Sequence, residues 1–295
     1  MSLTKTTILL FGATGSGKTA QIGILAEHIF RTTGKKTRLY TADKGGTKTI
    51  QPYIKLGIIE PIEILETNPW IFLDKSTKGF VRDEKGKWVA GDFSSIGMVA
   101  FESFRSFAEE LLMWQAEKAG EGISIGGGSN ISFQVQGDGE TLKVGGGNVS
   151  HYKVAQDRMT SAIWRSQKLP VPYILWTTSV SKEDGQLAVG KVLGPDVIGK
   201  ALTEETPRWF QLTLHITVLP AAMGKAERHL LHLGTHQDAS SGNATAMGNI
   251  RQSLDAPVLK SSIIEPANIV DALTIIEGGY DPATAAIAAR CGLKV

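Results

Sequence analysis

Ten residues near the N-terminus combine glycine, lysine and threonine at a spacing that suits the binding of phosphate. The run is Leu10-Phe11-Gly12-Ala13-Thr14-Gly15-Ser16-Gly17-Lys18-Thr19, which fits the pattern G-x-x-x-x-G-K-[ST] in full. Glycines let the backbone wrap closely around an anion, so that consecutive N–H groups converge on its oxygens. Lys18 is expected to reach the β- and γ-phosphates of a nucleotide, and the Thr19 hydroxyl to ligate Mg²⁺. The alternative is a glycine-rich turn with a chance lysine.

The segments on either side of this run are those that a phosphate-binding loop requires. Before it, residues 6–11 are a short apolar run rich in β-forming side chains, as expected of a buried parallel strand. After it, apolar residues recur at the spacing of an amphipathic helix, namely Ile22, Leu25, Ala26, Ile29 and Phe30. The N-terminus of that helix adds unsatisfied N–H donors and a partial positive charge. The residues expected to bind the nucleotide are Gly12, Ala13, Thr14, Gly15, Ser16, Gly17, Lys18, Thr19 and Ala20.

Hydrolysis of a bound nucleotide needs an ordered Mg²⁺ and an oriented water, and two acidic residues are placed to supply them. Glu102 follows the apolar run Met98-Val99-Ala100-Phe101, and Asp43 closes an earlier strand-like run at residues 36–43. In doubly wound sheets, ligands lie at the carboxyl ends of the strands, where both acids stand. Glu102 is expected to hold Mg²⁺, as in a Walker B strand, and Asp43 to polarise the attacking water. For each, the alternative is a solvated acid at a strand end or one that caps a helix.

Other polar side chains are candidates for sensing the γ-phosphate or for completing the site of a neighbouring subunit. Thr178 and Ser179 end a later apolar run, where a hydroxyl can hydrogen-bond the phosphate or simply cap a buried strand. Phosphoryl transfer is often completed by a cation from a neighbouring subunit or element. The cations considered for that role are Lys225, Arg228 and Arg251, each of which is otherwise a solvated surface charge.

Composition limits the classes of protein to which the chain can belong. Its 295 residues allow one large domain or two modest ones, and a net charge of +2 gives no sign of a nucleic-acid binder. A single cysteine, Cys291, excludes an intrachain disulfide and fits a reducing compartment. Without a membrane-spanning apolar stretch or room for a signal peptide, we expect a cytoplasmic protein with no membrane partner. His229 and His232 would face opposite sides of a strand, which argues against a zinc site there.

Strand-like and helix-like segments alternate along the chain, which predicts an α/β fold with a doubly wound, mainly parallel sheet. A further strand is expected at 62–66, and an antiparallel pair at one edge of the sheet at 212–219 and 229–234. Two β-hairpin insertions are expected, at about 79–90 and within the glycine-rich segment 120–150. Helices are expected at 104–119, 151–168, 265–277 and 283–290. The predicted division is a nucleotide-binding domain at 1–260 and a short helical extension at 261–295.

Taken in order, these motifs resemble those of RecA-like P-loop ATPases, and in particular the compact phage-encoded group related to Sak-type single-strand annealing proteins. The resemblance covers most of residues 1–255 and rests on residues 12–19, Tyr40-Thr41-Ala42-Asp43, Val99-Ala100-Phe101-Glu102-Ser103, residues 174–179, residues 194–200 and Gly248-Asn249-Ile250-Arg251. It implies ATP- and Mg²⁺-dependent action in DNA recombination or replication, on single-stranded DNA. It also implies a homo-oligomer, a ring or a filament, with ATP bound between subunits.

Two features depart from the family that the chain resembles. Such proteins usually carry aspartate where this chain has Glu102 and glutamate where it has Asp43, so the lengths of the two acids are exchanged. The glycine-rich hairpin, in the place of a DNA-contacting loop, offers only Lys143 and Phe133 for phosphate contact and base stacking. The loop at 182–200 is a second candidate for contact with DNA. For both loops the alternative is a contact between subunits or a surface loop.

Three functions therefore stay open. The first is a DNA-dependent ATPase, with ATP expected because the chain has no Asn-Lys-x-Asp run for guanine. The second is a nucleotide-binding assembly protein that oligomerises with slow or no hydrolysis, which the exchanged acids and the sparse positive charge favour. The third is a motor core of the helicase or packaging type. A kinase is disfavoured, because the chain shows no lid with clustered arginines.

Overall fold

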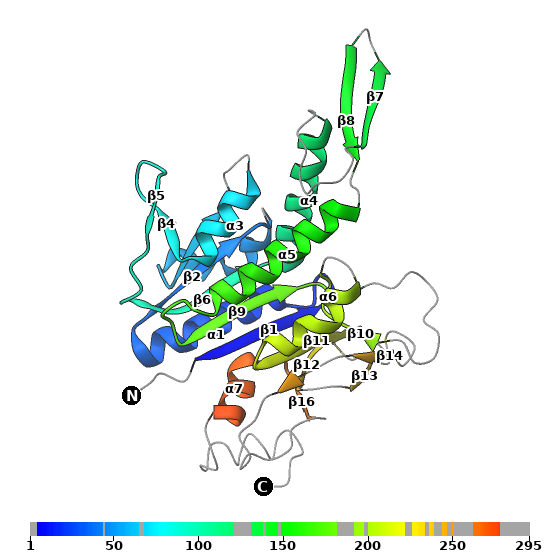
Figure 1. Cartoon of the computed structure of the whole chain (residues 1–295). Helices are drawn as coiled ribbons and strands as arrows, with labels where there is room; N and C mark the ends of the chain where they lie inside the picture. Colours follow the sequence, from blue (N-terminus) through cyan, green and yellow to red (C-terminus); the bar gives the residue numbers. More distant parts are fainter. Residues whose placement is uncertain are drawn as a thin grey trace.

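A large β-sheet forms the centre of the computed structural model (Figure 1). The structure describes residues 5–43, 45–64, 68–120, 131–137, 140–146, 149–181, 192–197, 200–221, 226–233, 236–238, 244–246, 249–250 and 262–277. Within these residues the sheet has nine strands in the order β16-β12-β11-β1-β9-β6-β2-β3, with β15 beside β11. Their bounds are β1 Thr6–Gly12, β2 Lys36–Thr41, β3 Ile59–Glu63, β6 Ile96–Glu102, β9 Tyr173–Thr178, β11 Leu212–Leu219, β12 Arg228–Leu233, β15 Asn249–Ile250 and β16 Ser262–Ile264.

The sheet is parallel through most of its width and antiparallel at one edge. From β11 through β1, β9, β6 and β2 to β3, each neighbouring pair is parallel. β12 and β15 run antiparallel to β11, and β16 runs antiparallel to β12. The predicted α/β class with a mainly parallel sheet is confirmed. The predicted antiparallel pairing of 212–219 with 229–234 is confirmed too, but β11 itself belongs to the parallel part, because it pairs with β1.

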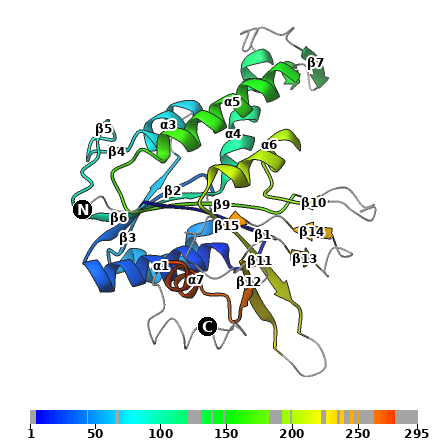
Figure 2. The same cartoon turned by 60° about the horizontal axis from the view of Figure 1, so that its bottom comes forward.

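Helices cover both faces of this sheet, as a doubly wound fold requires. Figure 2 shows α1 and α7 on one face, and α3, α4, α5 and α6 on the other. Each face has its own apolar core: Ile8 and Leu10 of β1 pack in the cluster that includes α1 and α7, while Leu9 packs in the opposite cluster. The helices are α1 Lys18–Thr33, α2 Gln51–Lys55, α3 Pro69–Thr77, α4 Phe104–Gly120, α5 Val149–Ser166, α6 Lys200–Glu205 and α7 Ile269–Glu277, with 3₁₀ turns η1 Gly46–Ile50 and η2 Thr206–Trp209.

Both predicted hairpin insertions are present. β4 Phe80–Arg82 pairs with β5 Trp88–Ala90, and β7 Ile131–Gly137 pairs with β8 Glu140–Gly146, each antiparallel. In Figure 1 the β7–β8 hairpin projects away from the sheet beyond the ends of α4 and α5. A small separate sheet joins β10 Val192–Leu193, β13 His236–Asp238 and β14 Ala244–Ala246.

Several predicted elements have somewhat different boundaries in the structure, and two of them differ most. The strand expected at 62–66 is β3, Ile59–Glu63, because its register places Ile59 opposite Thr37 at the start of β2. The helix expected at 265–277 begins only at Ile269, because the Asn268 side chain accepts a hydrogen bond from the Val270 N–H at 3.0 Å and so caps α7. The helix expected at 283–290 lies outside the described residues.

The C-terminal segment up to residue 277 continues the main fold. β16 pairs with β12, and Ile269, Ala272 and Leu273 of α7 are buried in the core that α1 also lines. A domain boundary at residue 260 stays a prediction. For the chemistry the consequence is that α7 lies on the same face of the sheet as α1, the helix that follows the phosphate-binding loop.

Candidate nucleotide site

The phosphate-binding loop connects β1 to α1 through two glycines that the local geometry requires. A side chain at Gly12 would place its Cβ only 2.3 Å from the Ile216 carbonyl oxygen of β11. Gly17 has a φ of 97°, in the left-handed region, and is the N-cap of α1. That N-terminus has no side-chain cap and no acidic residue in its first turn. Its N–H groups are therefore available to an anion, as the sequence predicted for this loop.

Lys18 lies across the loop that precedes it. Its Nζ donates to the carbonyl oxygens of Gly12 and Ala13, at 2.9 Å each. Burial lowers the pKa of Lys18, while the negative charges of Glu102 and Asp43 raise it again. The charges of both acids therefore act on the Lys18 ammonium group. The structure thus brings together the lysine and the two carboxylates that sequence analysis selected.

Thr19 lies in the first turn of α1 and contacts Glu102, the last residue of β6. The Thr19 hydroxyl donates a hydrogen bond to Oε1 of Glu102. Glu102 is 3% exposed, and its second oxygen, Oε2, is buried without a hydrogen-bond partner in the described part of the chain. Burial raises the pKa of Glu102; the Thr19 hydrogen bond lowers it, the charge of Asp43 raises it, and the charge of Lys18 lowers it. A hydroxyl beside a carboxylate oxygen that lacks a partner is a donor set that fits Mg²⁺.

Asp43 follows the end of β2, next to the end of β6. Thr41 is opposite Glu102 in the β2–β6 register, and the Ala42 N–H donates to the Glu102 carbonyl at 2.7 Å. The Asp43 side chain is exposed, and its Oδ1 accepts a hydrogen bond from the Gly45 N–H at 3.0 Å. Asp43 therefore stabilises the turn before η1, and its charge raises the pKa of both Lys18 and Glu102. The structure thus shows a solvated acid at a strand end that stabilises a turn, and the role of Asp43 in polarising the attacking water stays a prediction.

The sensor candidates lie at the end of β9, beside β1. Thr178 is opposite Phe11 in the β1–β9 register and is fully buried. Its hydroxyl donates to the Asp196 carbonyl at 2.5 Å, and the Asp196 N–H donates to the Ser179 carbonyl at 2.7 Å. Arg105 of α4 pairs with the Asp196 carboxylate at 3.0 Å. The Thr178 hydroxyl thus fixes the following loop in this structure, and a role as phosphate sensor stays a prediction.

Of the three cations considered as trans-acting, the described residues include Arg228. Its guanidinium pairs with both carboxylate oxygens of Glu265, at 3.1 and 3.3 Å. Lys225 and Arg251 lie outside the described residues, as does the loop 182–191. In the β7–β8 hairpin, Phe133 is opposite Val144 and Gln134 is opposite Lys143, and contact with DNA stays a prediction.

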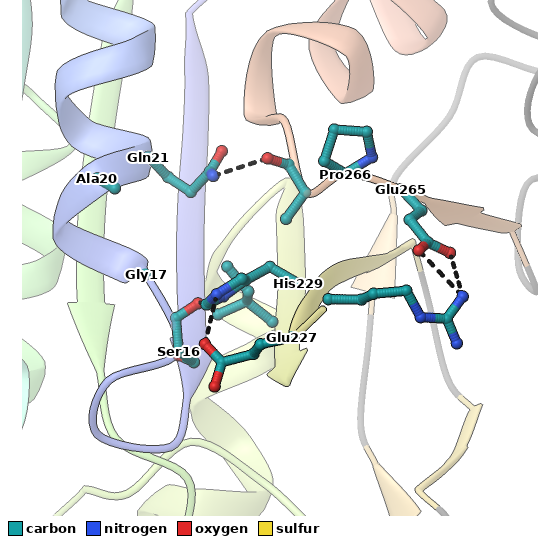
Figure 3. A pocket seen from close by; sticks show the side chains of 11 residues that line it. Ser16, Gly17, Ala20, Gln21, Glu227, His229, Glu265 and Pro266 are labelled. Atoms are coloured by element: carbon teal, nitrogen blue, oxygen red, sulfur yellow. Dashed lines mark hydrogen bonds and ion pairs between the residues drawn. The ribbon is translucent and has the colours of Figure 1, made fainter. Parts of the chain in front are cut away.

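A cavity of about 400 Å³ adjoins the phosphate-binding loop on the side of β12, and the sequence did not predict it. Its lining includes Ser16 and Gly17 of the loop, Gln21 of α1, His229 of β12, and Glu265 and Pro266 before α7 (Figure 3). His229 Nδ1 lies 2.9 Å from the Ser16 carbonyl oxygen, and Nε2 lies 3.0 Å from Glu227 Oε1. On the other side of β12, His232 Nε2 contacts the Thr217 hydroxyl. The described residues hold no cluster of three or more His, Cys, Asp or Glu side chains suited to a metal.

Comparison with known proteins identifies no family for this chain. No protein-family model and no curated protein matches the sequence. Among solved structures, the chain is similar to a KaiC-like protein from the hyperthermophilic archaeon Pyrococcus horikoshii OT3, with 12% identity and a TM-score of 0.41 over 82% of this chain and 88% of that one. The fold class stated above follows from the strand order and pairing of this chain itself. Among the described helices, none has the length and apolar character needed to cross a membrane.

Proposed function

We propose that this protein is a RecA-like P-loop ATPase that binds Mg²⁺–ATP at the end of β1 and hydrolyses it. The observation that carries the proposal is the hydrogen bond from Thr19, the last residue of the phosphate-binding pattern, to the buried carboxylate of Glu102. Thr19 and Glu102 come from separate motifs, and phosphoryl transfer requires both to lie beside the same Mg²⁺. Their contact, with Lys18 beside them, is what a coincidental glycine-rich turn would not produce.

The proposed chemistry assigns each side chain a task. Bound Mg²⁺ supplies charge neutralisation on the phosphate oxygens. Thr19 and Glu102 would hold it, with Oε2 of Glu102 as the oxygen that has no other partner. Lys18 exchanges its bonds to the Gly12 and Ala13 carbonyls for phosphate oxygens. Asp43 orients the attacking water and accepts its proton.

A second candidate is an assembly protein that binds ATP, oligomerises and turns ATP over slowly. The observation that favours it is the position of Asp43: the side chain is exposed and one oxygen is engaged by the Gly45 N–H. A short acid tied to its own turn is less free to follow a water than the longer glutamate that RecA-like proteins usually carry there. Slow turnover with tight binding would follow from that geometry.

The biological setting that we propose is phage DNA recombination or replication, with single-stranded DNA as the partner and a homo-oligomeric ring or filament as the active form. The support for this part is the sequence resemblance. The protruding β7–β8 hairpin, which carries Lys143 and Phe133, is the DNA-contacting element that we propose. The location that we propose for the protein is the host cytoplasm, which agrees with this role.

The deciding experiment measures ATP hydrolysis and Mg²⁺–ATP binding with and without single-stranded DNA, for the parent protein and for Lys18→Ala. Loss of binding or turnover in Lys18→Ala is the expected result, with Lys55→Ala as the matched control, because Lys55 is an exposed lysine of α2. Stimulation of turnover by DNA supports the recombination role, and tight binding with negligible turnover supports the assembly protein. Binding and turnover that survive Lys18→Ala would refute the site.

A further inference from the structure

One peptide group of the phosphate-binding loop is held from behind by a side chain of the antiparallel edge. The ring Nδ1 of His229, on β12, lies 2.9 Å from the carbonyl oxygen of Ser16. A backbone carbonyl can only accept a hydrogen bond, so Nδ1 must carry the hydrogen and donate it. Figure 3 shows the ring against the loop, at the rim of the cavity.

This hydrogen bond fixes the direction of an amide that the loop uses for binding. The peptide between Ser16 and Gly17 is trans and planar, so the Gly17 N–H points opposite to the Ser16 carbonyl. With the carbonyl directed at His229, the N–H points away from β12. The phosphate is expected on that side too, because Thr19 and Glu102, which would hold its Mg²⁺, meet toward β6, and β6 and β12 lie on opposite sides of β1 in the sheet. The contact therefore aims the Gly17 N–H in the direction from which an anion can reach it.

Gly17 makes such a restraint necessary. Its φ of 97° and ψ of 14° lie in the left-handed region, and glycine adopts positive and negative φ about equally well. The peptide that precedes it can therefore rotate at little steric cost. A Cβ on Gly17 would lie at ordinary contact distance, 3.6 Å, from His229 Nδ1, which shows how closely the ring approaches this residue.

The position of His229 is itself held at two further points. Nε2 of the ring lies 3.0 Å from Oε1 of Glu227, with which the protonated ring forms an ion pair, and the His229 carbonyl accepts a hydrogen bond from the Ala267 N–H at 2.8 Å. The segment that contains Ala267 is in turn fixed to α1: Gln21 Nε2 donates to the Ala267 carbonyl at 2.9 Å, and the Ile269 N–H donates to Gln21 Oε1 at 2.7 Å. Gln21 is 4% exposed, so both bonds are shielded from water.

We propose that His229 is a positioning residue for nucleotide binding, which orients the Gly17 amide through the Ser16 carbonyl. The inference rests on the proposed function, because it concerns how the same loop binds phosphate. On this proposal the C-terminal half of the chain takes a direct part in forming the phosphate site. It does so through β12 and the segment before α7.

The test compares two amides of equal polarity at position 229. In His229→Asn the amide nitrogen can occupy the place of Nδ1 and donate to Ser16, whereas in His229→Gln it reaches the place of Nε2, beside Glu227. We expect His229→Asn to bind Mg²⁺–ATP almost as the parent does. His229→Gln and His229→Leu should bind about tenfold more weakly, which corresponds to one lost hydrogen bond. Titration with a fluorescent ATP analogue measures the affinity.

Two controls separate positioning from general damage. His28→Leu changes an exposed histidine of α1 and should leave affinity unchanged. Thermal unfolding without nucleotide should give closely similar midpoints for His229→Asn and His229→Gln, since the His229 side chain is 35% exposed. Equal affinity in the Asn and Gln variants would overturn this inference while the proposed function stands. Absence of Mg²⁺–ATP binding in the parent protein would overturn the proposed function and this inference with it.

Discussion

The hydroxyl of Thr19 donates a hydrogen bond to Oε1 of Glu102 across 83 positions of sequence. The contact joins the first turn of α1 to the end of β6, and β9 separates β6 from β1 in the sheet. The acid is therefore not on the strand next to the phosphate-binding loop but one strand further along. The glutamate side chain spans that separation and contacts the Thr19 hydroxyl.

Glu102→Gln should retain Mg²⁺–ATP binding and lose turnover. The amide keeps the volume of the side chain and an oxygen for the Thr19 hydroxyl, but it removes the negative charge that a metal needs. Metal-assisted stabilisation of phosphoryl transfer is worth several kcal/mol, so we expect kcat to fall by about a hundredfold. Single-turnover kinetics at saturating ATP would measure the change.

The matched control for this substitution is Glu117→Gln, at an exposed position of α4, which should leave kcat unchanged. If Glu102→Gln hydrolysed ATP at the parent rate, Asp43 alone would have to organise the metal. Loss of ATP binding together with turnover would indicate that Glu102 acts in forming the loop rather than in catalysis.

Stability without Mg²⁺ should fall as pH rises through the titration of Glu102. Burial raises the pKa of this carboxyl above its ordinary value of 4.5, so between that value and the raised one the folded protein retains a proton that the unfolded chain has lost. In this window the unfolded state binds fewer protons, and the free energy of unfolding decreases with pH. The contribution is fully present below the ordinary pKa and is lost once the folded carboxyl ionises.

Thermal unfolding from about pH 4 to about pH 8, where carboxyl groups titrate, would measure this effect as the difference between the parent and Glu102→Gln. The free energy of unfolding of Glu102→Gln should lack this decrease with pH. The stability of the variant relative to that of the parent should therefore rise as pH rises. Mg²⁺ should reverse the trend in the parent, because it replaces the proton on the carboxylate, and should have little effect on the variant. A parent–variant difference independent of pH would contradict the assignment.

Much of this site could be predicted because its signals are local. Each signal lies within about ten residues: the phosphate-binding pattern, the apolar run before Glu102, and the end of β2 before Asp43. Parallel strands then bring their carboxyl ends to one edge of the sheet. The contact between His229 and Ser16 has no such signal, since it depends on β12 folding back antiparallel to β11, more than 200 positions from the loop. The start of α7 did have a local signal, Asn268, which the proline at 266 obscured.

Gly12→Ala should destabilise the fold and weaken nucleotide binding together. The added Cβ would lie 2.3 Å from the Ile216 carbonyl oxygen and 2.8 Å from Ser16 Oγ, so β1 and β11 would have to separate. Forcing a methyl group into a packed interior costs about 1–3 kcal/mol, which denaturant unfolding would detect. Gly45→Ala is the matched control, because a Cβ there meets Asp43 Oδ1 at an ordinary 3.8 Å. Equal stability of the two variants would show that β11 shifts at little energetic cost to accommodate the added methyl group.

Asp43→Asn distinguishes the two roles that this residue combines. The amide retains an oxygen for the Gly45 N–H, so the turn before η1 should persist, but it cannot accept a proton from water. If Asp43 acts as the base, kcat falls by about a hundredfold or more while ATP affinity changes little. Asp92→Asn is the matched control: Asp92 Oδ1 accepts a hydrogen bond from the Ser94 N–H at 2.8 Å in the same kind of turn, away from the loop. Turnover unchanged in both variants would leave Asp43 a turn-forming residue and would contradict its role as the base that activates water.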